Sequence, residues 1–393
     1  MLTPDGLPPL DARDRERSAG LAARLRERIA AGGGWLPFSA FMQAALYEPG
    51  LGYYMADGRI FGEAGDFVTA PELSPLFANC VANAVDPLLA AAGGSEIVEF
   101  GAGSGRLAGD LVAALARRGR APRRYHIVEP SRSLQLRQRQ LLERVAAGAT
   151  AFEWLDSPPR EVWSGVAIAN EVLDALPVDR FRVTAQGCDA VGVAADGDAF
   201  CWQAQPADAP LATGVDGLQE RLPEPMRPGF TSELRPGQEA WLREATASLA
   251  RGVLIVVDYG LPRAHYYHAT RDGGTLAAFR RHRRVEDLLA APGTQDLTAW
   301  VDYSALAEAA RACGLEPAGF ATQAHFLLET GIESELARLV EFAPERDRAA
   351  HRQAAATLLL PGEMGERFKV MALARGIRAP IQGFGFRDLG ASL

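Results

Sequence analysis

The stretch that most constrains this chain is the segment EIVEFGAGSGRLAGD, which runs from Glu96 to Asp110. Its apolar residues up to Phe100 are typical of a buried parallel strand. Gly101, Gly103 and Gly105 follow, and glycines at this spacing let the backbone turn sharply and approach a ligand closely. A helical pattern begins at about residue 104, and the first turn of a helix presents unpaired N–H groups. The segment therefore predicts a strand, a tight turn and a helix that together bind a nucleotide-like ligand.

The spacing of the glycines narrows the choice of ligand. A dinucleotide-binding turn has the pattern G-x-G-x-x-G, and here Arg106 occupies the position of its third glycine. Glu99 stands two residues before the first glycine, and this acidic residue followed by G-x-G-x-G resembles motif I of the class I S-adenosylmethionine (SAM) methyltransferases. The resemblance implies that Glu99 and the loop backbone hold the amino-acid end of SAM. An NAD oxidoreductase and a glycine-rich turn without a ligand remain the alternatives.

Composition excludes several classes of protein. The 393 residues carry a formal net charge of -8, with a pI near 5.4, which argues against a nucleic-acid partner or an anionic membrane surface. No uninterrupted apolar run is long enough to span a bilayer. The four cysteines are scattered and form no C-x-x-C pair, so neither zinc nor disulfides are predicted. The first 17 residues lack the features of a presequence, and we therefore expect a cytoplasmic protein.

The order of the predicted elements indicates the fold class. Five apolar strand-like runs up to residue 260 alternate with helical patterns, a hairpin is expected over 180–202, and 203–237 is rich in loop-forming residues. Two further apolar runs, 324–328 and 368–374, complete the set. This pattern predicts an α/β protein with a doubly wound, seven-stranded, Rossmann-like sheet. We expect an N-terminal helical extension over 1–92 that covers the site, and a methyltransferase domain over 93–393 with insertions at about 203–250 and 332–366.

Several residues at strand or helix ends are candidates for contacting the cofactor. Glu129 ends the second predicted strand, where α/β nucleotide-binding folds recognise ribose hydroxyls. Asp156 ends the third strand and could reach the adenine amino group, and Asn170 ends the fourth. Thr69 and Pro71 precede an apolar helix, whose start could form a wall of the pocket. For Glu129, Thr69 and Pro71, helix capping or initiation is the competing interpretation.

Eight motifs occur together in order along nearly the whole chain, from about residue 37 to residue 376. They read GDFVTAPELSPLF, EFGAGSGRLAGDL, HIVEPS, ANEVLDALPV, VDYG, GTLAAFRRH, PGTQDLTAWVDY and TQAHFLLETGI. This set resembles the MidA family of SAM-dependent methyltransferases, whose eukaryotic members are mitochondrial complex I assembly factors that methylate an arginine. The resemblance implies SAM as cofactor, an arginine of a partner protein as acceptor and a respiratory-complex subunit as a possible substrate. A noncatalytic SAM-binding assembly factor and a small-molecule methyltransferase stay open.

Glu171 and Asp174 are the candidate catalytic residues. They follow the fourth strand, at the edge where parallel α/β sheets bind their ligands. An arginine acceptor arrives charged, so two carboxylates could clamp it, orient one nitrogen and accept the released proton. Alternatively, Asp174 caps a helix and Glu171 lines the cofactor. The segments of the family resemblance that follow residue 257 supply a candidate substrate rim, namely Asp258, Tyr259, His282, Asp296 and Thr298.

The sequence contains one histidine pair at a spacing that metal sites use. His265 and His268 are separated by two residues, but the next acidic residue, Asp272, lies in an Asp-Gly-Gly sequence typical of a turn, and no cysteine is near. We therefore expect no metal.

Overall fold

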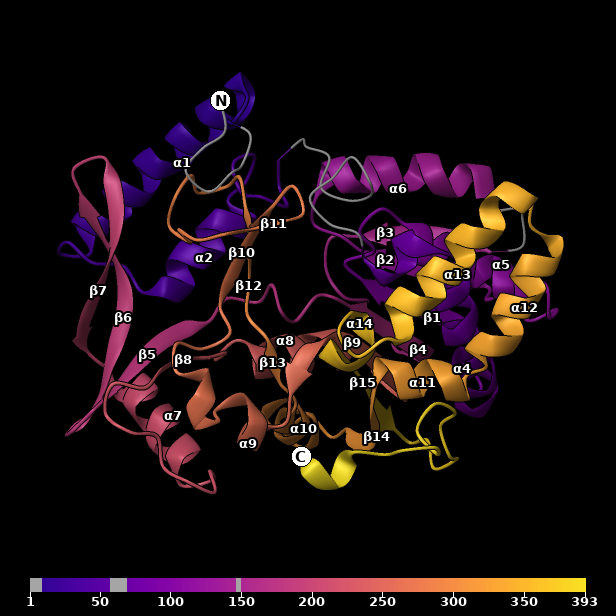
Figure 1. Ribbon diagram of the computed structural model, residues 1–393. Helices are drawn as coiled ribbons and strands as arrows, with labels where there is room; N and C mark the ends of the chain where they lie inside the picture. The colour runs from indigo at the N-terminus through magenta and orange to yellow at the C-terminus, as the bar shows by residue number, and fades with distance from the viewer. Residues whose placement is uncertain (1–8, 57–68, 146–149) are drawn as a thin grey trace. The chain divides into compact units, whose positions relative to one another are not determined.

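The chain is described by a computed structural model that covers residues 9–56, 69–145 and 150–393 (Figure 1). Its contacts group these residues into two compact units. The first, here called the hairpin unit, comprises residues 9–56, Asp174–Gln238 and Leu261–Asp302. The second, the sheet unit, comprises residues 69–173, Glu239–Gly260 and Tyr303–Leu393.

The sheet unit is organised by a strand order that defines its fold class. Along the sheet the order is β14-β15-β9-β4-β1-β2-β3, and β1 to β4 and β9 pair in parallel, whereas β15 runs antiparallel to both β9 and β14. The strands are β1 (Glu96–Phe100), β2 (Arg124–Val128), β3 (Ala151–Leu155), β4 (Trp163–Asn170), β9 (Leu249–Leu261), β14 (Glu316–Thr322) and β15 (Phe368–Arg375). The order reverses between β1 and β4, which is where open α/β sheets bind ligands. The predicted doubly wound α/β architecture is confirmed, with these seven strands on the path of a sheet that has eight strands among the described residues.

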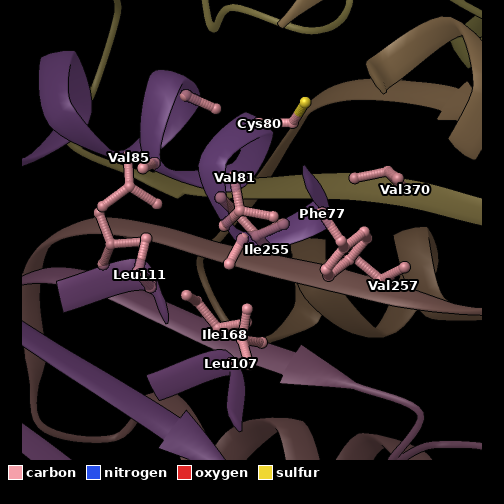
Figure 2. Close-up of a cluster of buried hydrophobic side chains, with 14 of the residues drawn as sticks. Phe77, Cys80, Val81, Val85, Leu107, Leu111, Ile168, Ile255, Val257 and Val370 are labelled. Carbon is pink, nitrogen blue, oxygen red and sulfur yellow. The ribbon is translucent and has the colours of Figure 1, made fainter. Parts of the chain in front are cut away.

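Helices cover this sheet and enclose its core. They are α3 (Ala70–Leu73), α4 (Leu76–Ala92), α5 (Arg106–Ala116), α6 (Arg132–Val145), α8 (Gln238–Thr246), α10 (Tyr303–Ala312), α11 (Gln323–Glu329), α12 (Ile332–Phe342), α13 (Glu345–Leu359), α14 (Met364–Arg367) and the 3-10 helix η2 (Gly390–Ser392). Helix α4 is apolar on most of its surface and is largely buried. Figure 2 shows its residues Phe77, Val81 and Val85 packed toward the strand residues Ile168 and Ile255. This helix and the central strands therefore form one hydrophobic core.

The hairpin unit contains two antiparallel sheets, with orders β7-β6-β5-β8 and β11-β10-β12. Its elements are α1 (Ala12–Ala31), α2 (Phe38–Tyr47), β5 (Asp179–Thr184), β6 (Gly187–Asp196), β7 (Ala199–Pro206), α7 (Ala209–Gln219), β8 (Thr231–Leu234), α9 (Arg263–Tyr266), the 3-10 helix η1 (Ala269–Arg271), β10 (Ala277–Arg280), β11 (Arg283–Val285), β12 (Asp296–Thr298) and β13 (Val301–Asp302). A separate apolar cluster, which includes Phe181, Val215 and Tyr266, stabilises it.

Two local expectations were wrong. The apolar run 324–328 is not a strand but part of helix α11, because Thr322 caps the helix by accepting a hydrogen bond from the backbone N–H of His325 (3.3 Å). The strand lies just before it, as β14. A short apolar run does not by itself distinguish a strand from a buried helix.

Residues 203–237 are also not a continuous loop, since they contain α7 and β8. Helix α7 starts at a cap in which Asp208 accepts a hydrogen bond from Leu211 N–H at 3.0 Å. In the compact units, α3 and α4 belong to the sheet unit, and the hairpin unit takes residues from three separate parts of the chain. The division into an N-terminal extension and a methyltransferase domain at residue 92 stays a prediction.

Candidate functional site

The glycine-rich loop of the sheet unit has a backbone that favours glycine at three positions. Gly101, Gly103 and Gly105 have φ angles of 63°, 55° and 87°, in the left-handed region that residues with a Cβ rarely adopt. A Cβ added at Gly101 would also lie 3.2 Å from Cγ2 of Val172, so the loop packs closely against the segment that follows β4. Helix α5 begins directly after the loop, at Arg106. The strand, turn and helix predicted from the sequence are therefore confirmed.

Glu129 lies at the end of β2, as predicted, and its carboxyl group is buried. One oxygen accepts a hydrogen bond from Ser131 N–H (2.9 Å) and the other from the amide of Gln138 (3.3 Å). Burial raises the pKa of Glu129 to about 7, although both hydrogen bonds favour its ionised form. Each oxygen keeps a second lone pair, which could accept a hydrogen bond from a ribose hydroxyl.

Glu99 is also buried, on β1 beside the loop. Its Oε2 atom accepts a hydrogen bond from the Tyr125 hydroxyl at 2.7 Å. Burial raises the pKa of Glu99 to about 7, the Tyr125 hydrogen bond lowers it, and the charge of Glu129 raises it further. The contact between Glu99 and the cofactor stays a prediction.

Asp156 follows β3 and is held from α6. Its two oxygens accept hydrogen bonds from Arg132 (3.1 Å) and from the side-chain amide of Gln135 (3.0 Å). Asn170 ends β4 and donates to Oε1 of Glu171 at 3.3 Å. Its own Oδ1 is buried and has no hydrogen-bond partner among the residues that the structure describes.

Thr69 and Pro71 stand at the start of the short helix α3, and Pro71 is buried. In the same helix, Glu72 accepts a hydrogen bond from the Ser104 hydroxyl of the glycine-rich loop. Helix α3 therefore contacts the loop. Whether Thr69 or Pro71 touches the cofactor stays a prediction, and the preceding residues 57–68, which carry the first part of the motif GDFVTAPELSPLF, lie outside the described residues.

Glu171 adopts a backbone conformation that is uncommon for its residue type. Its φ angle is 53°, although it is not a glycine, and its N–H donates to the carbonyl of Val257 at 2.8 Å. Strained backbone of this kind costs of order 1–3 kcal/mol and is concentrated at functional sites. Because Val172 is the residue that packs against Gly101, Glu171 lies next to the segment in contact with the glycine-rich loop.

Asp258, expected at the substrate rim, is instead fully buried, with an exposed fraction of 0%. Its carboxylate accepts hydrogen bonds from the backbone N–H groups of Leu173 (2.9 Å) and Tyr259 (2.8 Å). It therefore fixes the turn after β4 from inside the sheet unit. Tyr259 is half-buried and its ring packs on Phe368, with 4.1 Å between centroids.

The hairpin unit brings together three other predicted residues. Asp174, Asp296 and Thr298 are all buried. The Thr298 hydroxyl donates to Oδ2 of Asp174 at 2.8 Å, and the hydroxyl of Tyr54 donates to Oδ1 of Asp296 at 2.7 Å. Burial raises the pKa of Asp174, whereas the Thr298 hydrogen bond and the charge of Arg235 lower it.

His282 has different surroundings from the buried residues Asp174, Asp296 and Thr298. It is exposed, and together with Arg281 it forms the turn of the β10–β11 hairpin, with φ angles of 62° and 50°. Its role at a substrate rim stays a prediction.

Sequence reasoning missed the polar side chains that hold these residues in place. Gln135 and Gln138 of α6 contact the carboxyl groups of Asp156 and Glu129. Arg235 donates at distances of 2.6 to 3.5 Å to four backbone carbonyls, those of Asp174, Leu176, Ala299 and Trp300. Only the placement of the two glutamines one helical turn apart was a usable signal.

Three features of the sheet unit are compatible with the binding of SAM. The glycine-rich loop has left-handed backbone at all three glycines, and a Cβ at Gly101 or Gly105 would lie 3.2 or 3.3 Å from a neighbouring side chain. Glu129 keeps acceptor capacity at the position predicted for ribose recognition. The buried Oδ1 of Asn170, without a partner among the described residues, could accept a hydrogen bond from the amino group of the cofactor.

The chain is similar to known methyltransferases. Residues 76–321 match a family model described as "Putative S-adenosyl-L-methionine-dependent methyltransferase". A crystal structure of a "likely methyl transferase" from Burkholderia thailandensis, bound to S-adenosyl-homocysteine, is 40% identical, with a TM-score of 0.92 over 98% of this chain and 100% of that one. A second crystal structure from the same organism, of a protein described as uncharacterized, is also 40% identical over the same shares, with a TM-score of 0.88.

Curated relatives resemble the chain over most of its length. A Drosophila melanogaster protein named "Protein arginine methyltransferase NDUFAF7 homolog, mitochondrial" is 28% identical over 98% of this chain and 93% of its own. The Homo sapiens NDUFAF7 protein, with the corresponding name, is 28% identical over 86% of this chain and 80% of its own.

These names correct one expectation. A cytoplasmic location was predicted from the first 17 residues, but the curated relatives are named as mitochondrial proteins. The composition of the first residues was a poor guide, because a targeting segment is no part of the folded domain that relatives share. Among the described residues, no helix is both long and apolar enough to cross a bilayer.

The doubly wound fold agrees with the two crystal structures. The chain belongs to the family of S-adenosyl-L-methionine-dependent methyltransferases.

Proposed function

We propose that this enzyme transfers a methyl group from SAM to an arginine side chain of a partner protein, and that Glu171 binds the acceptor. The observation that carries this proposal is the left-handed backbone of Glu171 at the carboxyl end of the central strand β4, adjoining the residue that packs on Gly101. The curated relatives that are named protein arginine methyltransferases support the choice of acceptor.

The chemistry requires little more than positioning. When bound, SAM supplies a methyl group that is already activated by its sulfonium. The acceptor guanidinium has a pKa above about 12 and arrives charged. A carboxylate can pair with it through two parallel hydrogen bonds, orient one nitrogen for in-line attack and accept the proton that methylation releases. Two hydrogen bonds support this role: Asn170 donates to a carboxylate oxygen of Glu171, and the Val257 carbonyl accepts from the backbone N–H of Glu171.

We propose that Asp174 of the hairpin unit is another carboxylate that can bind a cationic side chain. It is buried, its pKa is raised chiefly by that burial, and the hydroxyl of Thr298 fixes one of its oxygens. A cation arriving beside Asp174 would favour its ionised form. A further carboxyl group of the same unit, that of Asp296, accepts a hydrogen bond from the Tyr54 hydroxyl.

The finer identity of the partner follows from the family resemblance. The MidA resemblance implies a respiratory-complex subunit as the methylated protein, and we propose a subunit of this kind as the first substrate to test.

The test is radiolabelled SAM incubated with the enzyme and a lysate of its host, followed by identification of the labelled protein and residue. Glu171→Gln should lower methyl transfer by about 10²- to 10⁴-fold, the usual contribution of a positioned acid or base. SAM affinity, measured by calorimetry, should change little. Glu161→Gln is a matched control, because Glu161 is an exposed glutamate of the same unit. Undiminished transfer by Glu171→Gln, or label on a residue other than arginine, would contradict the proposal.

A further inference from the structure

Two glutamines of α6, here called the amide bracket, lie one helical turn apart on the buried side of that helix. Gln135 and Gln138 are 3% and 0% exposed. Burying an amide costs free energy unless its hydrogen bonds are replaced, so an apolar residue would be the cheaper choice at a position that serves packing alone. The contacts of these amides show what they hold.

Gln138 connects three elements of the candidate cofactor site. Its Nε2 donates to the carbonyl of Gly103 at 3.0 Å and to Oε2 of Glu129 at 3.3 Å. Its Oε1 accepts a hydrogen bond from the indole N–H of Trp154 on β3 at 2.9 Å. Both donor hydrogens and the acceptor oxygen are therefore in use.

The stem of Gln138 also explains the third glycine of the loop. A Cβ at Gly105 would lie 3.3 Å from Cγ and 3.4 Å from Cα of Gln138. Gly105 is thus in contact with α6, and its φ of 87° adds to the preference for glycine. The loop and the amide of Gln138 form one packed arrangement.

Gln135 makes the corresponding contacts one turn earlier. Its Nε2 donates to the backbone carbonyl of Glu129 at 2.6 Å and to Oδ1 of Asp156 at 3.0 Å. Its Oε1 accepts a hydrogen bond from Arg132 at 3.2 Å. The backbone of Glu129, its carboxyl group and the carboxyl group of Asp156 are therefore all held from one helix.

We propose that the amide bracket positions the residues that bind SAM. Gln138 fixes the glycine-rich loop relative to the Glu129 carboxylate, and Gln135 fixes the carboxyl group of Asp156. The inference rests on the proposed cofactor site. It adds two residues that do not themselves contact SAM and act through those that do.

A positioning role differs from packing in its electrostatic effect. The N–H of Gln138 favours the ionised form of Glu129, the form that accepts hydrogen bonds from ribose hydroxyls. Glu99 on β1 interacts electrostatically with this carboxyl, and the charged groups Asp156 and Arg132 are connected to the backbone of Glu129 through Gln135. A glutamate at position 138 would withdraw the donor and place a second carboxyl beside Glu129, without changing the shape of the side chain.

The decisive variant is Gln138→Glu, with SAM affinity measured by calorimetry on the full chain between pH 6 and pH 9. We expect about tenfold to hundredfold weaker binding at pH 7.5, the loss typical of one hydrogen bond to a charged group. The pH below which SAM affinity falls should also move upward. Gln140→Glu is the matched control, since Gln140 is exposed on the same helix, and it should leave both quantities unchanged.

Two further measurements keep the inference testable if Gln138→Glu does not fold. Trp154→Phe removes the indole N–H that orients the amide, together with part of the ring that Arg139 and Phe152 contact, and it should weaken SAM binding about twofold to tenfold. In the wild-type protein, the side-chain ¹⁵N signals of Gln138 should shift with the titration of Glu129 and again when SAM is added.

The outcomes separate the inference from the proposed function. A folded Gln138→Glu protein with wild-type SAM affinity and an unchanged pH profile would overturn the proposed role of the amide bracket. Side-chain ¹⁵N signals of Gln138 that do not shift when SAM is added would do the same. None of these measurements uses an acceptor, so a wrong acceptor assignment would leave them intact. A wild-type chain that binds no SAM would overturn both proposals together.

Discussion

Asp258→Asn tests whether the turn that carries Glu171 is held from inside the sheet unit. The Asp258 carboxylate accepts two backbone hydrogen bonds, from Leu173 (2.9 Å) and Tyr259 (2.8 Å). Hydrogen bonds to a charged group contribute about 1.5–3 kcal/mol each. The asparagine amide keeps one acceptor oxygen, but its NH₂ group then faces the other N–H. We therefore expect the free energy of unfolding of the sheet unit to fall by about 2–3 kcal/mol.

Two readouts follow from this change. The Tm measured by calorimetry should fall by roughly 4–12 °C for a unit of this size. Methyl transfer should fall by about 10²-fold if the turn moves by about 1 Å, because catalysis depends steeply on the position of the reacting groups. SAM affinity should change much less, since the two N–H groups that this carboxylate accepts from belong to Leu173 and Tyr259 and not to the glycine-rich loop.

Asp287→Asn is the control, because exposed Asp287 accepts a single backbone hydrogen bond, from Leu289 at 3.0 Å. It should cost little stability and no activity. A stable and fully active Asp258→Asn enzyme would refute the argument that this carboxylate positions Glu171. A variant that loses stability but keeps its rate would show that Asp258 is structural only.

Three other predictions concern the sheet unit. Burial raises the pKa of Glu129 to about 7, so the carboxyl is mostly neutral at pH 6 and ionised at pH 8. Because ribose hydroxyls donate to the ionised form, SAM should bind about tenfold more weakly at pH 6 than at pH 8 in calorimetric titrations. Gly101→Val should abolish SAM binding, because its φ is 63° and its Cβ would contact a neighbouring segment, whereas Gly237→Val should bind SAM normally. Burial raises the pKa of Cys80 to about 12, so mass spectrometry after maleimide treatment at pH 7.5 should find exposed Cys201 labelled and Cys80 unmodified until the chain unfolds.

Each of these has a contrary result. A pH slope that survives in Glu129→Gln would assign the titration to Glu99, whose pKa is also raised to about 7. Gly101→Val with full SAM affinity would exclude the loop from the cofactor site. Rapid labelling of Cys80 in the folded protein would contradict its burial.

Local pattern was enough for the parts of this protein that depend on short stretches of chain. The strand, glycine turn and helix from Glu96 to Asp110 were readable because backbone conformation at glycines and apolar periodicity are local properties. The positions of Glu129 and Glu171 followed from the rule that ligands gather at the carboxyl ends of parallel strands. The repeated alternation of strands and helices then led to the doubly wound sheet.

Local pattern failed where two structures suit the same residues. The run 324–328 is apolar and short, and only the cap at Thr322 and the pairing of β14 with β15 show that it is helical. The hairpin unit is assembled from three distant parts of the chain, so its boundaries depend on contacts between residues far apart in sequence.

The sequence alone predicted SAM as the cofactor, through the resemblance of the glycine-rich loop to motif I, and it predicted candidate residues at the ends of strands, because both are short local patterns. Only the tertiary structure decided what holds these residues. Asp258 proved to be bonded inside the sheet unit to the turn after β4, and Gln135 and Gln138 proved to be hydrogen-bonded to the candidate cofactor residues Asp156 and Glu129. The physical reason is that a buried polar side chain is defined by its partners, and these partners lie on other strands and helices.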